Sequence, residues 1–341
     1  MKYLSFVVPS YNASAYLNKC VESLAIGGDD VEIIIVNDGS KDNTLEIANE
    51  LKVKHPNNVI VIDKENGGHG STINAALKVA TGLYFKCVDA DDWVDPKAYM
   101  ELLSKIKEHY ANNEVVDMYI CNFMYENLSE NKQCLDTHKK RFPVGKICTF
   151  EEVKKFPVGE FLMMHNVINR LEILKKANVE MPEHTFYIDN LYLYLPLYYT
   201  NTLCYLDIDF YRYYVGRPNQ SVTLENMTKN YAMQIRVIRE MSLRYTYDEL
   251  KSLSRKKRNF IIHELVIIHH LTLFYIVAGL NKQRKEEYAN FMKEFKEKNR
   301  KLYMKVRYRT SFAFPMILIP PLRKFAIMAG YKCIVRRTHW N

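Results

Sequence analysis

Four carboxylates follow one short apolar run in the chain. The sequence DADDWVD places Asp89, Asp91, Asp92 and Asp95 within seven positions, directly after the apolar LYF. Like charges this close repel, and burial strengthens the repulsion. Asp89 and Asp91 are two residues apart at a predicted strand end, so both can reach one hard cation, and Mg²⁺ and Mn²⁺ prefer such oxygen ligands. The alternative is a solvated turn in which Asp92 or Asp95 caps the following helix.

Three other polar segments have similar positions after apolar runs: PSYN (9–12), NDGSKD (37–42) and KENGGHGS (64–71). A carboxylate in NDGSKD can accept from a base N–H or a ribose hydroxyl, or it can cap a helix beside a glycine turn. The paired glycines of KENGGHGS at a helix N-terminus suit an anion. This segment matches neither a Walker loop nor G-x-G-x-x-G, which disfavours a P-loop NTPase or a dinucleotide enzyme.

The elements that must position these segments alternate over the first 120 residues. Short β-branched apolar runs predict strands, and the intervening periodicity predicts helices. The strands are expected at 4–9, 31–38, 58–63, 82–91 and 115–121, and the helices at 14–26, 42–54, 70–80 and 96–110. This alternation predicts a doubly wound α/β sheet with ligands at the carboxyl ends of its strands, where all four polar segments lie.

The rest of the chain has a different pattern. Residues 121–150 read as irregular, and residues 151–225 as short helices with many tyrosines. The later helices are expected at 228–245, 248–279 and 283–306. The apolar stretch 260–280 contains Glu264 and three histidines, which indicates a buried or interfacial helix rather than a membrane span.

Charge divides the chain into two parts. From residue 251 onward there are 21 Lys and Arg against 5 Asp and Glu, a net of +16, whereas the whole chain carries +9. The seven cysteines are scattered without a C-x-x-C pair, so a reducing cytosol is the expected compartment, and a metal cluster or disulfide framework is not expected. The N-terminal apolar run is too short for a signal peptide and reads as a strand.

Four segments together resemble glycosyltransferase family 2: FVVPSYNASAYLNKCVESL, EIIIVNDGSKDNT, NGGHGSTINAAL and ATGLYFKCVDADDWVDP. They follow the family order and spacing over residues 1–100, and HNVINRLEILKKANVEMPEHTFYIDNLYLY resembles the acceptor-side segment. The resemblance implies a GT-A fold, a mostly parallel α/β sheet flanked by helices. The glycosyltransferase domain would span 1–225, with a nucleotide-sugar half at 1–120 and an acceptor-side half at 121–225. A helical, basic region would follow at 226–341.

The resemblance also implies an activity: transfer of a sugar, with inversion, from a nucleotide-sugar, usually a UDP-sugar, with a divalent metal, Mn²⁺ or Mg²⁺. The metal ligands would be Asp91 and Asp89. Asp189 in YIDN would be the base, and Glu183 is the competing base. The implied donor-binding residues are Pro9, Tyr11, Asn12, Asp38, Lys64, Asn66, Gly67 and Asp89.

Several assignments stay open at this point. Arg212, Arg217 and Gln220 either approach phosphate or acceptor sugar or serve the structure. His69 and His165 are interpreted as structural residues in preference to ligands. The chain lacks the Q-x-x-R-W sequence of processive family members, which favours transfer of a single sugar.

The partners expected are a nucleotide-sugar and a glycan or lipid-linked acceptor, without nucleic acid. The basic C-terminal region, with its mixture of apolar and aromatic residues, suits an anionic cytosolic membrane surface. A solvated basic surface is the alternative. A sugar-phosphate nucleotidyltransferase and a non-catalytic protein of the same fold are the competing functions.

Overall fold

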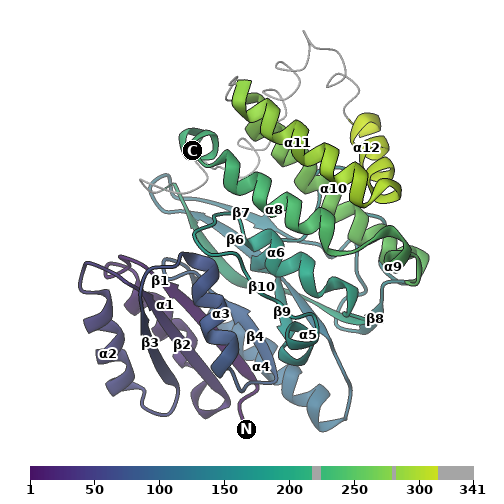
Figure 1. Ribbon diagram of the computed structural model, residues 1–341. Coiled ribbons are helices and arrows are strands. Elements are labelled where there is room, and N and C mark those ends of the chain that lie inside the picture. The colour runs from purple at the N-terminus through teal and green to yellow at the C-terminus, as the bar shows by residue number, and fades with distance from the viewer. Residues whose placement is uncertain (217–223, 279–281, 314–341) are drawn as a thin grey trace.

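One mixed sheet forms the centre of the computed structural model, which describes residues 1–216, 224–278 and 282–313. Within these residues ten strands form the sheet, with the order β3-β2-β1-β4-β9-β6-β10-β5, and β7 and β8 pair with β6 and β10 (Figure 1). The strands are β1 (Leu4–Ser10), β2 (Val31–Asp38), β3 (Val59–Lys64), β4 (Tyr84–Cys87), β5 (Trp93–Val94), β6 (Met118–Asn127), β7 (Lys132–Asp136), β8 (Ile147–Thr149), β9 (Val167–Arg170) and β10 (Thr202–Val215).

Helices cover both faces of the sheet and continue beyond it. The α-helices are α1 (Leu17–Ala25), α2 (Thr44–Lys54), α3 (His69–Val79), α4 (Pro96–Ala111), α5 (Leu171–Lys176), α6 (Asp189–Tyr194), α7 (Leu224–Lys229), α8 (Tyr231–Arg244), α9 (Tyr247–Lys251), α10 (Arg255–Ala278), α11 (Lys282–Lys298) and α12 (Arg300–Ala313). Short 3₁₀ turns lie at η1 (Gly28–Asp30), η2 (Met164–Asn166) and η3 (Leu195–Tyr198).

The strand sequences explain why the sheet is buried on both faces. Side chains alternate along a strand, so Phe6 and Val8 of β1 join one core while Val7 between them joins the other. α1, α2 and α4 contribute to the core of Phe6, and α3 contributes to that of Val7. The continuous apolar runs are therefore the pattern of strands covered on both sides.

The predicted α/β organisation is confirmed, with corrections beyond residue 87. β1, β2, β3 and β4 pair in parallel as expected. The strand predicted at 82–91 ends at Cys87, so the acidic segment lies outside it. Residues 121–150, expected to be irregular, contain the end of β6 and the strands β7 and β8; that prediction was wrong because the edge strand KQCLD is too polar to show a strand pattern.

β9 separates the parallel strands from the rest of the sheet. It pairs antiparallel with β4 on one side and with β6 on the other. β6 then pairs in parallel with β10. The sheet is thus parallel on the N-terminal side and mixed beyond β4, an arrangement that depends on long-range pairing and is not visible in local sequence patterns.

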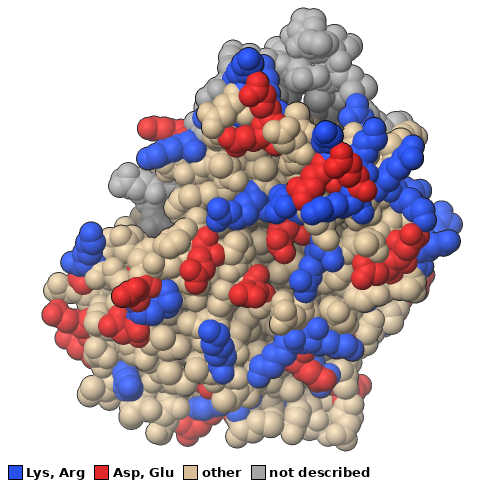
Figure 2. Space-filling view, in the orientation of Figure 1, with Lys and Arg blue, Asp and Glu red and all other residues tan. Residues whose placement is uncertain are grey.

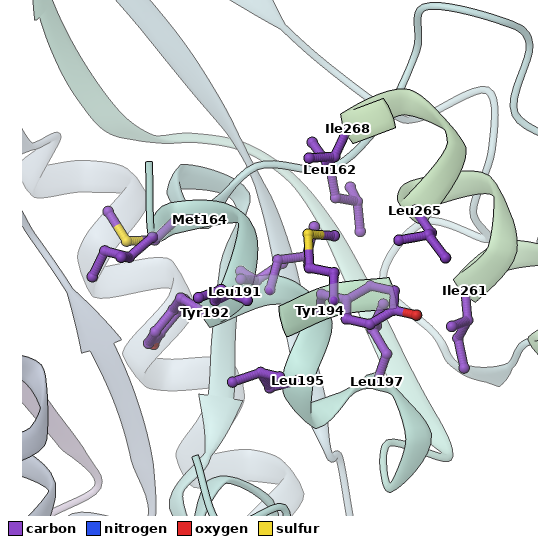
Figure 3. Close-up of a cluster of buried hydrophobic side chains, with 14 of the residues drawn as sticks. Leu162, Met164, Leu191, Tyr192, Tyr194, Leu195, Leu197, Ile261, Leu265 and Ile268 are labelled. Carbon is purple, nitrogen blue, oxygen red and sulfur yellow. The ribbon is translucent and has the colours of Figure 1, made fainter. Parts of the chain in front are cut away.

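The C-terminal helices pack onto the segment 162–197 rather than standing apart from it. Figure 3 shows Leu162, Leu191 and Tyr194 facing Ile261 and Leu265 of α10 in one buried cluster. The single helix predicted at 248–279 is two helices, α9 and α10, and that at 283–306 is likewise divided between α11 and α12. Among the described helices none combines the length and apolar character needed to cross a bilayer.

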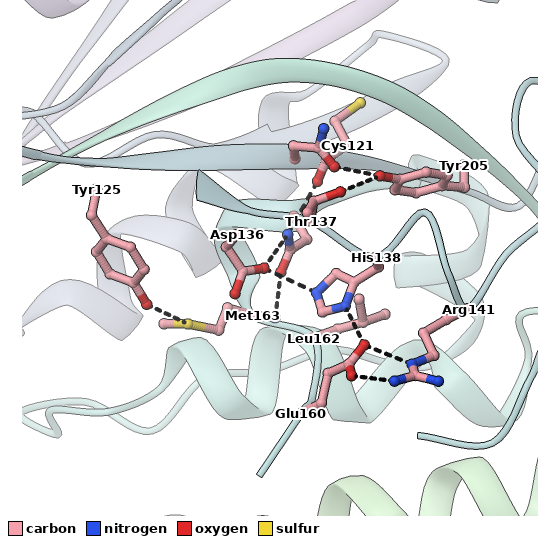
Figure 4. Close-up of polar contacts among 12 residues, drawn as sticks. Cys121, Tyr125, Asp136, Thr137, His138, Arg141, Glu160, Leu162, Met163 and Tyr205 are labelled. Atoms are coloured by element: carbon pink, nitrogen blue, oxygen red, sulfur yellow. Dashed lines mark hydrogen bonds and ion pairs between the residues drawn. The ribbon is translucent and has the colours of Figure 1, made fainter. Parts of the chain in front are cut away.

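A buried ion cluster fixes the segment that leads into η2 (Figure 4). His138 is 2% exposed and lies between two carboxylates, with Nε2 3.0 Å from Asp136 Oδ1 and Nδ1 3.3 Å from Glu160 Oε1. Arg141 donates to both oxygens of Glu160 at 2.9 and 2.8 Å. Burial opposes protonation of His138, but the two carboxylates outweigh it and raise its pKa to about 9. His263 of α10 contacts the Glu160 carbonyl at 2.7 Å, so the cluster joins three segments.

This cluster predicts a pH-dependent stability. The folded pKa of His138, about 9, lies above its ordinary 6.5, so its stabilising contribution is complete below pH 6.5 and is lost as the pH rises through 9. We expect the free energy of unfolding of the wild type to fall by about 3 kcal/mol more than that of His138→Gln across this interval. Urea titrations at both ends of the range measure this difference, and equal slopes for the two proteins would contradict it.

Candidate active site

Asp38 at the end of β2 organises the glycine loop. Its carboxylate is 2% exposed and accepts from Lys64 Nζ at 2.9 Å and from the N–H groups of Gly67 and Gly68 at 2.9 and 2.8 Å. Asn66 donates its side-chain amide to the Asp38 carbonyl at 2.8 Å. Four of the predicted donor residues, Asp38, Lys64, Asn66 and Gly67, therefore form one network.

The glycines in this loop permit close backbone packing. A Cβ on Gly67 would lie 2.7 Å from Ser71 Oγ, and Gly68 has a φ of +81°, which favours glycine. A Cβ on Gly68 would also lie 3.0 Å from the backbone of His184. The loop therefore has almost no room for a side chain at Gly67, which lies against Ser71, or at Gly68, which lies against His184.

The loop after β1 is tied to the loop after β2. The Asn12 N–H donates to Ser40 Oγ at 3.0 Å, and the Lys41 N–H donates to Asn12 Oδ1 at 2.8 Å. Pro9 lies within β1 in register with Val36, while Tyr11 is 50% exposed at the rim. The predicted nucleotide-side residues thus share one edge of the sheet with Asp38.

The four carboxylates after β4 divide into two pairs. Asp92 is 1% exposed and accepts from the Tyr211 hydroxyl at 2.6 Å and from the Tyr214 N–H at 2.8 Å. Asp95 caps α4 by accepting from the Ala98 N–H at 3.0 Å, and it pairs with Arg212 at 3.0 Å. These two carboxylates serve the structure, in line with the capping interpretation of the sequence.

Asp89 and Asp91 form the other pair, and both are partly exposed. Asp89 Oδ1 lies 3.0 Å from His69 Nε2. Burial opposes protonation of His69, but the Asp89 carboxylate raises its pKa well above the ordinary value. Burial, reinforced by the charge of Asp89, raises the pKa of Asp92 well above its usual range. Asp92 thus contributes less negative charge to the segment than the partly exposed carboxylates do.

A buried amine supports this segment from within the sheet. Lys86 is 0% exposed, and its Nζ donates to the carbonyls of Met164, His165 and Val167 at 2.7, 2.9 and 3.2 Å. Burial lowers the pKa of Lys86 to about 7. Lys86 is not among the residues predicted from the sequence, although a lysine between apolar residues of a central strand is a signal of such a buried amine.

His165 is held as a neutral ring. It is 4% exposed and stacks on Tyr213 with centroids 4.4 Å apart, and burial lowers its pKa to about 4. Neither ring nitrogen has a hydrogen-bond partner within the described residues. Its packing fits the structural interpretation weighed from the sequence.

The segment that carries Asp189 is anchored to α3. Asn74 and Met181 exchange two hydrogen bonds of 2.8 Å, and the His184 N–H donates to the Gly67 carbonyl at 2.7 Å. Asp189 then opens α6. Burial, with a contribution from Asp89, raises the pKa of Asp189 to about 6, and His69 acts in the opposite direction. Asp189 is thus electrostatically coupled to the residues at the end of β4.

Other residues considered as ligands have different positions. Glu183 is exposed on the same segment. Arg212 forms ion pairs with Glu126 and Asp95, both at 3.0 Å, and these contacts fit the structural alternative for this residue. Arg217 and Gln220 lie outside the described residues.

The donor chemistry of the rim fits a hard divalent cation. Asp89 and Asp91 offer carboxylate oxygens at the edge where the loops after β1, β2 and β3 meet, and Mg²⁺ uses one or two carboxylates together with substrate phosphates. Asp89 and His69 are 30% and 27% exposed in their side chains, so the edge is open to solvent.

The glycosyl transferase family 2 model matches residues 5–176, just over half of the chain and the loops that follow β1, β2, β3 and β4. The chain belongs to this family. It is therefore a glycosyltransferase, which favours glycosyl transfer over the nucleotidyl transfer considered from the sequence.

Curated relatives of this family 2 protein include enzymes of bacterial surface polymers. The chain is 36% identical over 115 residues to the minor teichoic acid biosynthesis protein GgaB of Bacillus subtilis and 39% identical over 120 residues to chondroitin synthase of Pasteurella multocida. These matches cover 33% and 35% of this chain but only 13% and 12% of those proteins. The uncharacterized glycosyltransferase YibD of Escherichia coli is 27% identical over 274 residues, 73% of this chain and 77% of YibD.

Solved structures show the same fold for this family 2 chain. S. aureus TarS in complex with UDP-GlcNAc superimposes with a TM-score of 0.66 at 18% identity, over 97% of this chain and 92% of that one. The mannosyltransferase PcManGT of Pyrobaculum calidifontis, in complex with GDP-Man and Mn²⁺, gives 0.52 at 14% identity, over 96% and 84%. The fold is GT-A, as the sequence resemblance implied.

The different environments of the carboxylates predict that two neighbouring alanine substitutions affect different properties, stability for Asp92 and ligand binding for Asp91. Asp92→Ala leaves the Tyr211 hydroxyl and Tyr214 N–H without their buried acceptor and should lower the free energy of unfolding by about 1–3 kcal/mol for each. Asp91→Ala should cost less because that side chain is partly exposed, but should abolish the Mn²⁺-dependent thermal shift produced by UDP. Denaturant and thermal-shift titrations measure both effects, and equal behaviour of the two variants would contradict the division.

Proposed function

We propose that this glycosyltransferase is metal-dependent and inverting, and that it moves one sugar from a UDP-sugar to a hydroxyl of a glycan or lipid-linked precursor without processive synthesis. The observation that carries the proposal is the coupling of a carboxylate with a raised pKa, Asp189, to the rim that holds Asp89 and Asp91. A base close enough to Asp89 to be influenced by its charge supports the proposal, because direct displacement would need a base near the metal ligands.

The donor would bind along the carboxyl edge of the parallel strands. Pro9, Tyr11 and Asn12 would border the base, and Lys64, Asn66 and Gly67 would line the diphosphate side. The Asp38 carboxylate already accepts from its own loop, so we propose that it shapes this pocket, and its contact with the uracil stays a prediction. A divalent cation held by Asp91 and Asp89 would neutralise charge that develops on the leaving diphosphate.

Asp189 would act on the acceptor. Its carboxylate accepts the proton of the acceptor hydroxyl while that oxygen bonds to the anomeric carbon. The bond from this carbon to the donor diphosphate breaks, and the nucleoside diphosphate leaves with the electron pair. Attack from the side opposite the leaving group inverts the anomeric centre. A pKa raised to about 6 keeps the group ionised at neutral pH yet more basic than an ordinary aspartate.

The names of the relatives support a surface polymer as the acceptor class. They include proteins named for teichoic acid, chondroitin and poly(ribitol-phosphate), although this chain spans only 12–18% of their length. We therefore propose an acceptor of the cell-surface polysaccharide type, with the donor sugar left to experiment.

Replacement of the proposed base tests this mechanism. Asp189→Asn keeps the size of the side chain and removes its basicity, so transfer should fall about 10²–10⁴-fold while the affinity for UDP changes little. Turnover with a panel of UDP-sugars and Mn²⁺, together with UDP binding by calorimetry, separates the two effects. Glu183→Gln is the matched control and should retain activity; a loss confined to Glu183→Gln would transfer the role to that residue.

We further propose that the protein docks on an anionic membrane surface through α12. This helix exposes Met304 and Tyr308, 54% and 70% exposed, beside the exposed cations Lys305 and Arg307. Figure 2 shows many Lys and Arg side chains over the C-terminal helices, interspersed with acidic ones. Apolar and aromatic groups among basic side chains suit the interface of an anionic leaflet.

Charge reversal tests the docking surface. Lys305→Glu with Arg307→Glu should weaken sedimentation with vesicles that contain phosphatidylglycerol, since each basic residue contributes about 1 kcal/mol at such a surface. Lys52→Glu with Lys97→Glu, on exposed positions of α2 and α4, is the matched control. Equal binding of both variants, or no binding of the wild type at low salt, would remove the proposal.

A further inference from the structure

Three side chains of different chemistry converge beneath the rim: His69 at the start of α3, Cys87 at the end of β4, and Asp89 two residues later. His69 Nε2 lies 3.0 Å from Asp89 Oδ1 and 3.9 Å from Cys87 Sγ. One ligand atom from each residue lies within 4.8 Å of the other two. An imidazole, a thiol and a carboxylate thus face the same small volume.

The spacing of these atoms matches a four-coordinate ion. Zinc bonds of about 2.3 Å to sulfur and about 2.0–2.2 Å to nitrogen or oxygen, at tetrahedral angles, separate N from S by about 3.6 Å and N from O by about 3.4 Å. The two distances in the structure, 3.9 and 3.0 Å, differ from these by a few tenths of an ångström. The third separation, between Cys87 Sγ and the Asp89 carboxylate, is within 4.8 Å, so the side chains would need to close by up to about an ångström around one ion.

We propose that His69, Cys87 and Asp89 form a binding site for a thiophilic divalent cation of the zinc class. A thiolate and an imidazole select such ions, whereas the oxygen ligands Asp89 and Asp91 select Mg²⁺ or Mn²⁺. Three protein ligands leave a fourth position for water, which is the arrangement of open zinc sites.

At this site a bound cation would take the place of protons. His69 Nε2 and Asp89 Oδ1 lie 3.0 Å apart where the cation would lie. Binding of the ion displaces any proton between them and the proton of the Cys87 thiol, and the displaced protons pass to solvent. Cys87 is 0% exposed, but His69 and Asp89 are 27% and 30% exposed, so the ion reaches the site from their side.

A second set, Asp89 with Asp92 and His165, is also close enough to share an ion. It is less suited because Asp92 and His165 are 1% and 4% exposed and the Asp92 oxygens already accept two hydrogen bonds. The Cys87 set is therefore the one that the geometry favours.

The site would share Asp89 with the proposed donor site. If the proposed function holds, an ion bound by His69 and Cys87 withdraws Asp89 from the donor, and zinc-class ions compete with Mn²⁺. The binding itself does not depend on the proposed function, because it requires only the three side chains.

Cobalt titration of the full-length protein tests the site directly. Co²⁺ is a spectroscopic substitute for Zn²⁺, and thiolate coordination gives a near-ultraviolet charge-transfer band. We expect this band in the wild type, saturating at one ion per chain and displaced by Zn²⁺. Cys87→Ala should lose it, and His69→Gln should weaken cobalt binding at least about tenfold.

Cys121→Ala is the matched control, because that thiol is equally buried in β6 but stands outside the set. It should keep the band, and circular dichroism should show that all variants are folded. Absence of the band in the wild type, or its persistence in Cys87→Ala, would overturn the proposal whether or not the enzyme transfers sugar from UDP-sugars. If Cys87→Ala does not fold, His69→Gln with unchanged cobalt affinity would overturn it equally.

Discussion

The repulsion among the four carboxylates that follow β4 is the constraint on which the site depends. The structure meets it by giving each carboxylate a different environment. Asp92 is buried against Tyr211 and the Tyr214 backbone, and its raised pKa reduces the charge there. Asp95 caps a helix and pairs with Arg212. Asp89 and Asp91 are then the two that neither cap a helix nor lie fully buried, so the burial of Asp92 and the pairing of Asp95 with Arg212 reduce the repulsion around them.

The glycine loop joins the parallel strands to the segment that precedes α6. Asp38 holds the loop from the strand side through two backbone N–H groups. From the other side, a Cβ on Gly70 would lie 2.5 Å from the Pro182 carbonyl, and Asn74 fixes the same segment at Met181. The position of Asp189 is therefore set by contacts with α3 that are as close as those within a single element.

Much of this arrangement could be predicted from the sequence. Apolar runs located the first four strands, and glycines and acids after them located the loops that gather at one edge. Asp95 and Pro96 correctly marked the start of α4. Local patterns could not show that β9 separates β4 from β6, since strand partners are chosen by long-range packing. The partners of Lys86 and Arg212 were likewise hidden, because they are backbone and carboxylate groups contributed by distant segments.

The position of β9 has a consequence for how such enzymes diversify. β9 lies about 80 residues after β4 in the chain but hydrogen-bonds to β4, the strand that precedes the acidic segment. A recombination event that exchanged only the first 120 residues would therefore replace both partners of β9, because its pairs with β6 lie at Met118, Tyr119 and Ile120. Successful chimaeras would need matching partners at this junction, so new specificities would arise more readily by point substitution in the loops than by shuffling of halves.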